Sequence, residues 1–172
     1  PKDVKHNAYF GVADVKIENK EGSYVVQTPI KSVLAELTII IENIPKGTEM
    51  SGKVLDCAGC LFPTQKNSDG DYGLPSIEPT EVELPTLLAT ESTLKSEVIR
   101  LMPTIQGSPA SHVYLRLQLP DETLQEFDIT APKMNVGGKY ELRFKYEEMQ
   151  PKMNLEATIN GWTNLNNEVE TK

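Results

Sequence analysis

The sequence predicts an all-β protein, a β-sandwich or barrel of about seven to nine strands. Apolar and polar residues alternate with a period of two, which is typical of antiparallel strands that bury one face. Clusters of proline, glycine, asparagine and aspartate separate these runs at short intervals, as turns do. The inward residues are enough for one sandwich core and too few for two, so we expect residues 1–172 to form a single domain.

Composition narrows the classes of function. The chain has 172 residues, of which 38% are hydrophobic and 24% charged, and this balance suits a folded domain. Uninterrupted apolar runs such as Ile39–Ile41 are far too short to cross a bilayer. The net charge of −8 repels phosphate backbones and anionic membrane surfaces, so no nucleic-acid partner is expected. Because the chain begins at Pro1, we expect a processed form or a trimmed chain, and export stays open.

The first part of the chain is expected to form four strands. Two come early, one from Phe10 and Val12 to Ile17 and one from Tyr24 to Ile30. The third, Val33–Ile44, contains neither proline nor glycine, so we expect a long strand at the centre of a sheet. The fourth, Gly52–Phe62, is expected to bend at Gly59.

The middle of the chain loses this pattern and then regains it. Residues 63–92 contain many prolines and are expected to form an irregular excursion, with one or two helical turns in Pro85–Ser92. Further strands are expected at Thr93–Pro103, His112–Leu119 and Leu124–Thr130.

The end of the chain predicts a closing β-hairpin. Its strands are Tyr140–Tyr146 and Met153–Ile159, which alternate on either side of a break at Gln150-Pro151. The single tryptophan, Trp162, follows. It is expected either to cap the open end of the sandwich or to serve as a stacking platform for a ligand. Residues 164–172 form a short polar tail without alternation.

Cys57-Ala58-Gly59-Cys60 is the one motif of the sequence that matches the spacing of a redox or metal site. A redox Cys-x-x-Cys usually opens a helix, and the following Leu61-Phe62-Pro63 does not start one. A zinc site would have to recruit His6 and His112. A local disulfide between Cys57 and Cys60, or two free thiols, is the simpler interpretation, and a thiol oxidoreductase is the enzymatic alternative.

A second candidate site is the acidic stretch around residue 70. Asn67, Asp69 and Asp71 place oxygen atoms at alternate positions, and Glu78 lies where a calcium loop would end. Tyr72 occupies the position where such a loop requires glycine, so an ordinary acidic turn is expected instead. We expect no metal and no cofactor.

The sequence contains few of the residues and motifs that hydrolytic enzymes use. The chain has two histidines and no Gly-x-Ser-x-Gly motif, so a catalytic triad has little to build on. The pair Glu147-Glu148 is more simply the solvated end of a strand than a pair of glycosidase carboxylates. Gly137-Gly138 precedes a strand, where a phosphate-binding loop would precede a helix. No catalytic residue is predicted.

Several segments resemble the fimbrillin-like families of Bacteroidales, which include the subunits, anchors and accessory proteins of type V pili. The similar segments at the end of the chain are Gly137–Leu142, Leu155–Ile159 and Trp162-Thr163. These families often end in the same order, with glycine, lysine and tyrosine before two strands and a tryptophan after them. The similar segments before them are Tyr9-Phe10-Gly11, Thr28–Lys31 leading into Val33–Ile44, and Leu101-Met102-Pro103 before the strand that begins at His112.

This resemblance implies a transthyretin-like antiparallel sandwich and a non-enzymatic role in cell-surface adhesion or pilus assembly. Members usually have two such domains, so the chain is expected to be the C-terminal domain of a longer protein or a compact member. They are exported lipoproteins of the outer membrane, and here the lipid anchor would lie outside this chain. Their subunits join by strand addition, for which Phe10–Ile17 and Thr93–Leu101 are the expected edge segments. The polar tail makes a poor donor strand, which favours an accessory, tip or anchor role.

A carbohydrate- or ligand-binding module at the cell surface is the alternative function. It would need exposed aromatic side chains in a groove, such as Trp162 with Tyr72 or Tyr114.

Overall fold

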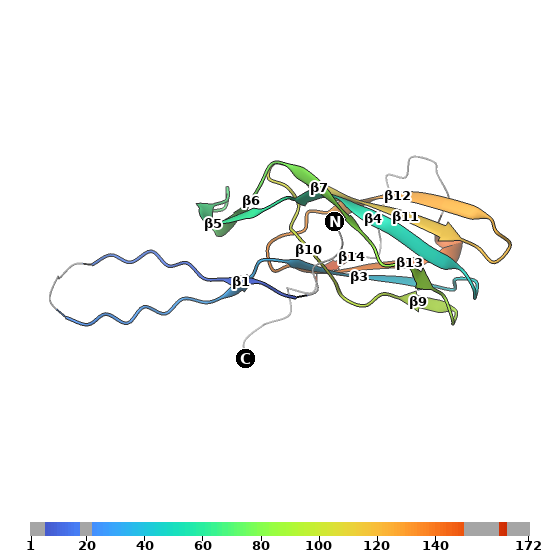
Figure 1. The fold of residues 1–172 in the computed structure, drawn as a ribbon, viewed down its shortest axis with the longest axis horizontal. Coiled ribbons are helices and arrows are strands. Elements are labelled where there is room, and N and C mark those ends of the chain that lie inside the picture. The colour runs from blue at the N-terminus through green and yellow to red at the C-terminus, as the bar shows by residue number, and fades with distance from the viewer. Residues whose placement is uncertain (1–5, 18–21, 150–161, 165–172) are drawn as a thin grey trace.

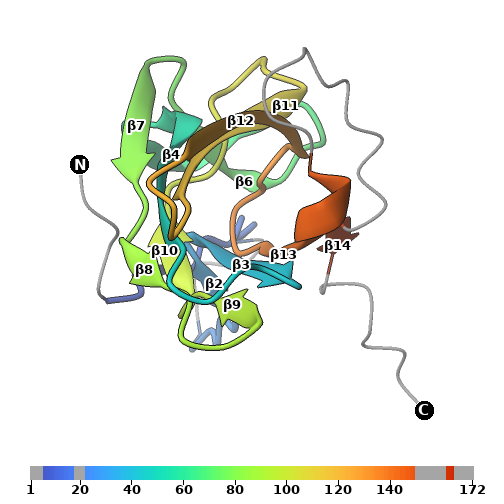
Figure 2. The same cartoon turned by 90° about the vertical axis from the view of Figure 1, so that its right-hand side faces the viewer.

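The computed structural model is a sandwich of two β-sheets, and it describes residues 6–17, 22–149 and 162–164, the last of these as backbone only. Figures 1 and 2 show the two layers facing each other. The first layer, the β4 sheet, runs in the order β12 (Leu124–Pro132), β11 (Ala110–Gln118), β4 (Glu49–Ala58) and β7 (Pro79–Glu83), and β8 (Leu87–Leu88) pairs with the start of β4. All of its pairs are antiparallel.

The second layer, the β3 sheet, runs in the order β10 (Ile99–Leu101), β3 (Ala35–Glu42), β13 (Lys139–Lys145) and β14 (Trp162–Asn164), and β9 (Thr93–Lys95) also pairs with β3. The predicted long strand is therefore central, as expected from its lack of proline and glycine. The segment Thr93–Leu101 lies at the edge of this sheet. The expectation of a purely antiparallel sandwich is wrong at one pair, because β3 and β13 run parallel.

The core between the layers is built from the inward residues of both sheets. The alternation that predicted β3 holds, since Ala35, Leu37, Ile39 and Ile41 are fully buried. Leu115 on β11 is fully buried as well, and residues of both sheets belong to one apolar cluster. The all-β sandwich predicted from period-two alternation is confirmed.

Residues 63–92 hold more strand than the sequence suggested. They include the end of β5 (Leu61–Lys66), then β6 (Tyr72–Pro75), β7 and β8. The helical turns expected in Pro85–Ser92 are absent, because Leu87–Leu88 pairs with β4 instead. The chain does break near Gly59, between β4 and β5. The prolines Pro75 and Pro79 fall at the end of one strand and the start of another, which are positions that tolerate a missing donor.

The two early strands were predicted wrongly. Only β1 (Tyr9–Phe10) and β2 (Lys31–Ser32) form a ladder, and they pair with each other outside the two main sheets. The described residues between them lie in no strand, and that part of the chain leads away from the sandwich and its two sheets.

The predicted closing hairpin is found in part. Its first run forms β13, followed by a 3₁₀ turn, η1 (Tyr146–Glu148). Its second run, Met153–Ile159, and the tail after Asn164 lie outside the described residues. The antiparallel partner of β13 is β14, with Leu142 opposite Trp162.

Candidate functional site

An arm of the chain projects from one end of the sandwich (Figure 1). We call residues 11–30 the arm, with Gly11–Ile17 as its outgoing segment and Gly22–Ile30 as its return segment. Figure 1 draws both segments in blue, extended and next to each other. The base is closed by β1 and β2, where Phe10 pairs with Lys31, and by the Val33 N–H, which donates to the Ala8 carbonyl at 2.7 Å. The arm is therefore attached at a defined point and leaves the body as extended chain.

The outgoing segment is tied to the hairpin of β5 and β6 by one carboxylate. Asp14 accepts a hydrogen bond from the Tyr72 hydroxyl and another from the Lys66 ammonium at 3.0 Å. The same ammonium lies 4.6 Å from the centre of the Tyr72 ring. The hydrogen bonds from Tyr72 and Lys66 hold the pKa of Asp14 below its usual range. The tether is therefore present at neutral pH and is lost as acid protonates Asp14.

Close packing fixes the base of the arm. Gly73 has a φ of +100°, and a Cβ at this position would lie 2.6 Å from Cζ of Phe10. Only glycine lets β6 approach the Phe10 ring so closely. Within the arm, the Thr28 hydroxyl donates to the Val12 carbonyl at 3.0 Å and ties the two segments together near the base.

Beyond its base the arm exposes apolar side chains. Val25 is 87% exposed, Ile30 70% and Ile17 62%, and Val15 and Val26 are also exposed. Single exposed apolar residues are normal on a protein surface, but a run of β-branched residues on a projecting segment is a feature of interaction sites.

The acidic stretch forms the turn between β5 and β6. The Asn67 side-chain oxygen accepts hydrogen bonds from the N–H groups of Asp69 and Asp71, both at 2.9 Å. That oxygen therefore stabilises the turn, an arrangement typical of asparagine in loops. Within the described residues, no group of three or more histidine, cysteine or acidic side chains is placed to hold a metal ion. The geometry supports the interpretation as an acidic turn.

A cleft of about 520 Å³ lies beside this turn, between it and the loops 104–109 and 133–136. Tyr72 is the single aromatic residue among those that line it, and the Lys66 ammonium lies over the Tyr72 ring. Tyr114 lies on β11 and does not line the cleft, while the side chain of Trp162 lies outside the described residues. The cleft therefore does not bring Tyr72 and Tyr114 together.

The two cysteines occupy different environments. Both are free thiols in the structure, Cys57 buried and Cys60 exposed, so a disulfide between them stays a prediction. Burial raises the pKa of the Cys57 thiol to about 12, and the neighbouring Asp56 carboxylate adds to the shift. A redox Cys-x-x-Cys needs a lowered thiol pKa, so the environment of Cys57 does not support an oxidoreductase.

We expect the two thiols of the reduced protein to differ in reactivity. Near neutral pH an aromatic disulfide reagent should modify Cys60 quickly and Cys57 only after unfolding, because Cys57 is buried and stays protonated. The measurement is a thiol titration with Cys60→Ser as the control variant. Two rapidly reacting thiols in the folded protein would contradict this prediction.

The raised pKa of Cys57 also implies that this group loses its contribution to stability as the pH rises from about 9 towards about 12.

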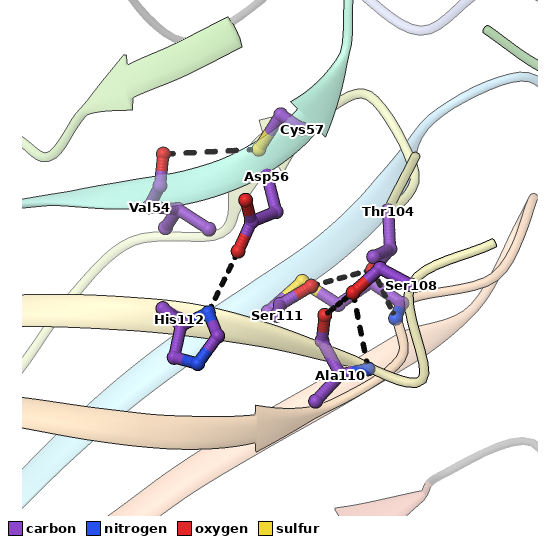
Figure 3. Close-up of polar contacts among 9 residues, drawn as sticks. Val54, Asp56, Cys57, Thr104, Ser108, Ala110, Ser111 and His112 are labelled. Atoms are coloured by element: carbon purple, nitrogen blue, oxygen red, sulfur yellow. Dashed lines mark hydrogen bonds and ion pairs between the residues drawn. The ribbon is translucent and has the colours of Figure 1, made fainter. Parts of the chain in front are cut away.

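Figure 3 shows the polar contacts around Asp56 and the start of β11. Asp56 has a φ of +60° at an irregularity of β4, and its carboxylate lies 2.7 Å from Nδ1 of His112. Ser111 is next to His112 on the strand, so its side chain points to the opposite face, where it contacts Thr104. Thr104 in turn accepts a hydrogen bond from the Met134 N–H at 2.8 Å. Ser111 and His112 therefore do not form a nucleophile and base pair.

Two crystal structures of Bacteroides proteins are similar to parts of this chain. A crystal structure from Bacteroides uniformis, described as a candidate cell adhesion protein, shares 13% identity with a TM-score of 0.45 and covers 70% of this chain and 48% of its own. A second such protein, from Bacteroides fragilis, shares 19% identity with a TM-score of 0.41 and covers 80% of this chain and 47% of its own. The chain thus spans about half the length of these structures. A comparison with curated proteins gives no match.

The family comparison extends over nearly the whole chain. Residues 5–168 match the model of the fimbrillin-A associated anchor proteins Mfa1 and Mfa2. Among the described residues, no helix is both long and apolar enough to cross a membrane. The match includes the arm, both sheets and β14. This chain belongs to the family of fimbrillin-A associated anchor proteins.

Proposed function

We propose that this chain is an accessory or anchor component of a surface fimbria and that it joins neighbouring subunits by β-strand addition. Membership of a family described as fimbrillin-associated anchor proteins supports the fimbrial role. The projecting arm is the observation that carries the mechanism. In strand addition, main-chain hydrogen bonds supply affinity, and alternate side chains fill pockets in the partner. An extended segment with exposed β-branched residues meets both needs.

The remaining parts of the proposal follow from this role. The chain acts without catalysis at the cell surface, held to the outer membrane by a lipid anchor. Residues 1–172 are one transthyretin-like domain of a longer protein. Among the described residues, one apolar cluster joins the two sheets, which supports a single domain.

Removing the arm should abolish binding to fimbrillin while leaving the sandwich folded. Phe10 and Lys31 are paired across the base, so residues 11–30 can be replaced by Asn-Gly, which closes two paired strands with a tight turn. The arm lies outside both sheets, so the free energy of unfolding should change by less than about 1 kcal/mol. The measurement is the affinity for purified fimbrillin from the same organism, with urea unfolding as the test of the fold.

The control variant is Asp69→Asn, which turns Asp69-Gly70 into Asn-Gly at the turn between β5 and β6. This change alters a neighbouring exposed loop of the same end of the molecule and keeps the arm. Undiminished fimbrillin binding by the variant without the arm would contradict the proposed mechanism.

Ligand binding has weaker support as a function. A sugar site usually offers exposed aromatic faces for stacking. The cleft beside the acidic turn is lined by one aromatic residue, Tyr72, which already hydrogen-bonds Asp14 and contacts Lys66.

A further inference from the structure

The two segments of the arm differ in whether they contain charged residues. The outgoing segment carries Asp14 and Lys16, and Asp14 is bound to the β5–β6 hairpin. The return segment, Gly22–Ile30, contains no charged residue, although 24% of the whole chain is charged. Its central part, Ser23–Thr28, combines β-branched and aromatic residues without charge, which is the composition of segments that pair readily into sheets.

The return segment exposes apolar side chains in both directions. Val25 and Val26 are neighbours, so in an extended chain they point to opposite sides. Both are exposed, Val25 at 87% and Val26 at 52%. A partner that covers one side of the segment would leave the other valine in water. In a two-layer sandwich an added strand turns one of these valines into the core, and the other is covered only where the outer face of the sheet is also packed.

The main chain at the centre of the return segment is also available. Among the described residues, Val25, Val26 and Gln27 make no hydrogen bond. Near the base of the arm, Thr28 bonds to Val12. The outgoing segment is bound to the β5–β6 hairpin through Asp14, and the main chain of Val25–Gln27 is left to pair.

We propose that Tyr24–Thr28 inserts as a strand into an open strand position of a fimbrillin subunit, in a groove that is uncharged on both sides. This inference rests on the proposed function and assigns its contact to one segment. A second copy of this chain is a poor occupant by charge. Each copy carries a net charge of −8, and its long edge strand β12 carries Glu126 and Asp128, which offer no match to a neutral strand.

Two matched proline substitutions test which segment pairs. Val25→Pro removes one main-chain donor from the return segment, and Val15→Pro does the same in the outgoing segment. Both valines are exposed and lie outside every ladder, so both variants should fold as the parent does by urea unfolding. Val25→Pro should weaken binding to purified fimbrillin from the same organism by about tenfold or more, and Val15→Pro by less than about threefold.

A third variant tests the chemistry of the groove. Val25→Lys keeps the main-chain donor and places a charge on the inserted strand, so it should also weaken fimbrillin binding by about tenfold or more. The conservative variant Val25→Ile should bind within about threefold of the parent.

Three outcomes would overturn this inference. The first is parent-like binding by Val25→Pro and Val25→Lys while the variant without the arm fails to bind; the proposed function then stands and another part of the arm makes the contact. The second is self-association of the parent that Val25→Pro abolishes in sedimentation experiments, which would make a second copy the occupant. The third is full binding by the variant without the arm, which removes the proposed mechanism together with the inference.

Discussion

Replacing Gly52 with alanine is expected to destabilise the protein by about 3 kcal/mol or more. Gly52 lies in the middle of β4, opposite Leu115 of β11. A Cβ there would overlap the carbonyl oxygen of Tyr114 and lie 3.2 Å from Cα of Leu115. Both atoms belong to the main chain of a central strand, so no side-chain rotation relieves the clash. The two strands would have to separate at the centre of the β4 sheet, and the loss should appear as a lower free energy of unfolding in urea.

Gly59→Ala is the matched control for this substitution. Gly59 follows the end of β4, and a Cβ there would meet the Thr80 methyl group at 3.4 Å, an ordinary contact. Its φ lies outside the positive region, so alanine should change the stability by less than about 1 kcal/mol. Equal stability of Gly52→Ala and Gly59→Ala would show that the strands adjust without cost and would contradict the prediction.

The parts of the fold that the sequence predicted well are those where one strand buries one face. In β11 the period-two alternation is unbroken, in β3 it is interrupted at Ile40, and the structure buries the expected inward residues of each. The parallel pairing of β3 with β13 was missed, because alternation specifies which face is buried and says nothing about which strand lies alongside or in which direction it runs.

The arm shows the opposite case. Val15, Ile17 and the valines Val25 and Val26 have the composition of strands, so local propensity predicts them as such. Their structure depends on whether another strand lies within hydrogen-bonding reach, and the arm leads away from both sheets. The sequence does carry a signal for this outcome, since Gly22–Ile30 contains none of the charged residues that edge strands commonly present to water.

The candidate chemical motifs could be judged only in part from the sequence. The residues Leu61-Phe62-Pro63 after the motif indicated that Cys57 and Cys60 do not open a helix, which the structure confirms by placing them at the end of β4 and just before β5. The contrast between a buried and an exposed thiol could not be foreseen, because the irregularity of β4 at Asp56 shifts its register. The role of Asp14 was also missed, since its partners Lys66 and Tyr72 are distant in sequence.

The second large effect is expected at Ile41, where substitution with alanine should cost about 3 to 4 kcal/mol. Ile41 is fully buried on the inner face of β3, opposite Phe144 of β13 and Leu94 of β9. Removing most of its side chain leaves a cavity between two sheets whose packed side chains cannot move in to fill it. The measurement is again the free energy of unfolding in urea, with an unchanged dependence on urea concentration.

Ile40 provides a control of the same residue type on the same strand. It is only 3% exposed, so burial alone would predict nearly the same cost, but it lies on the outer face and is not part of the core cluster of the described residues. Its cross-strand neighbours are Arg143 and Lys95, whose long apolar stems can shift over the space that alanine leaves. Ile40→Ala should therefore cost about half as much as Ile41→Ala. Equal losses would mean that the outer face of β3 is packed as rigidly as the core, and the distinction between its two faces would fail.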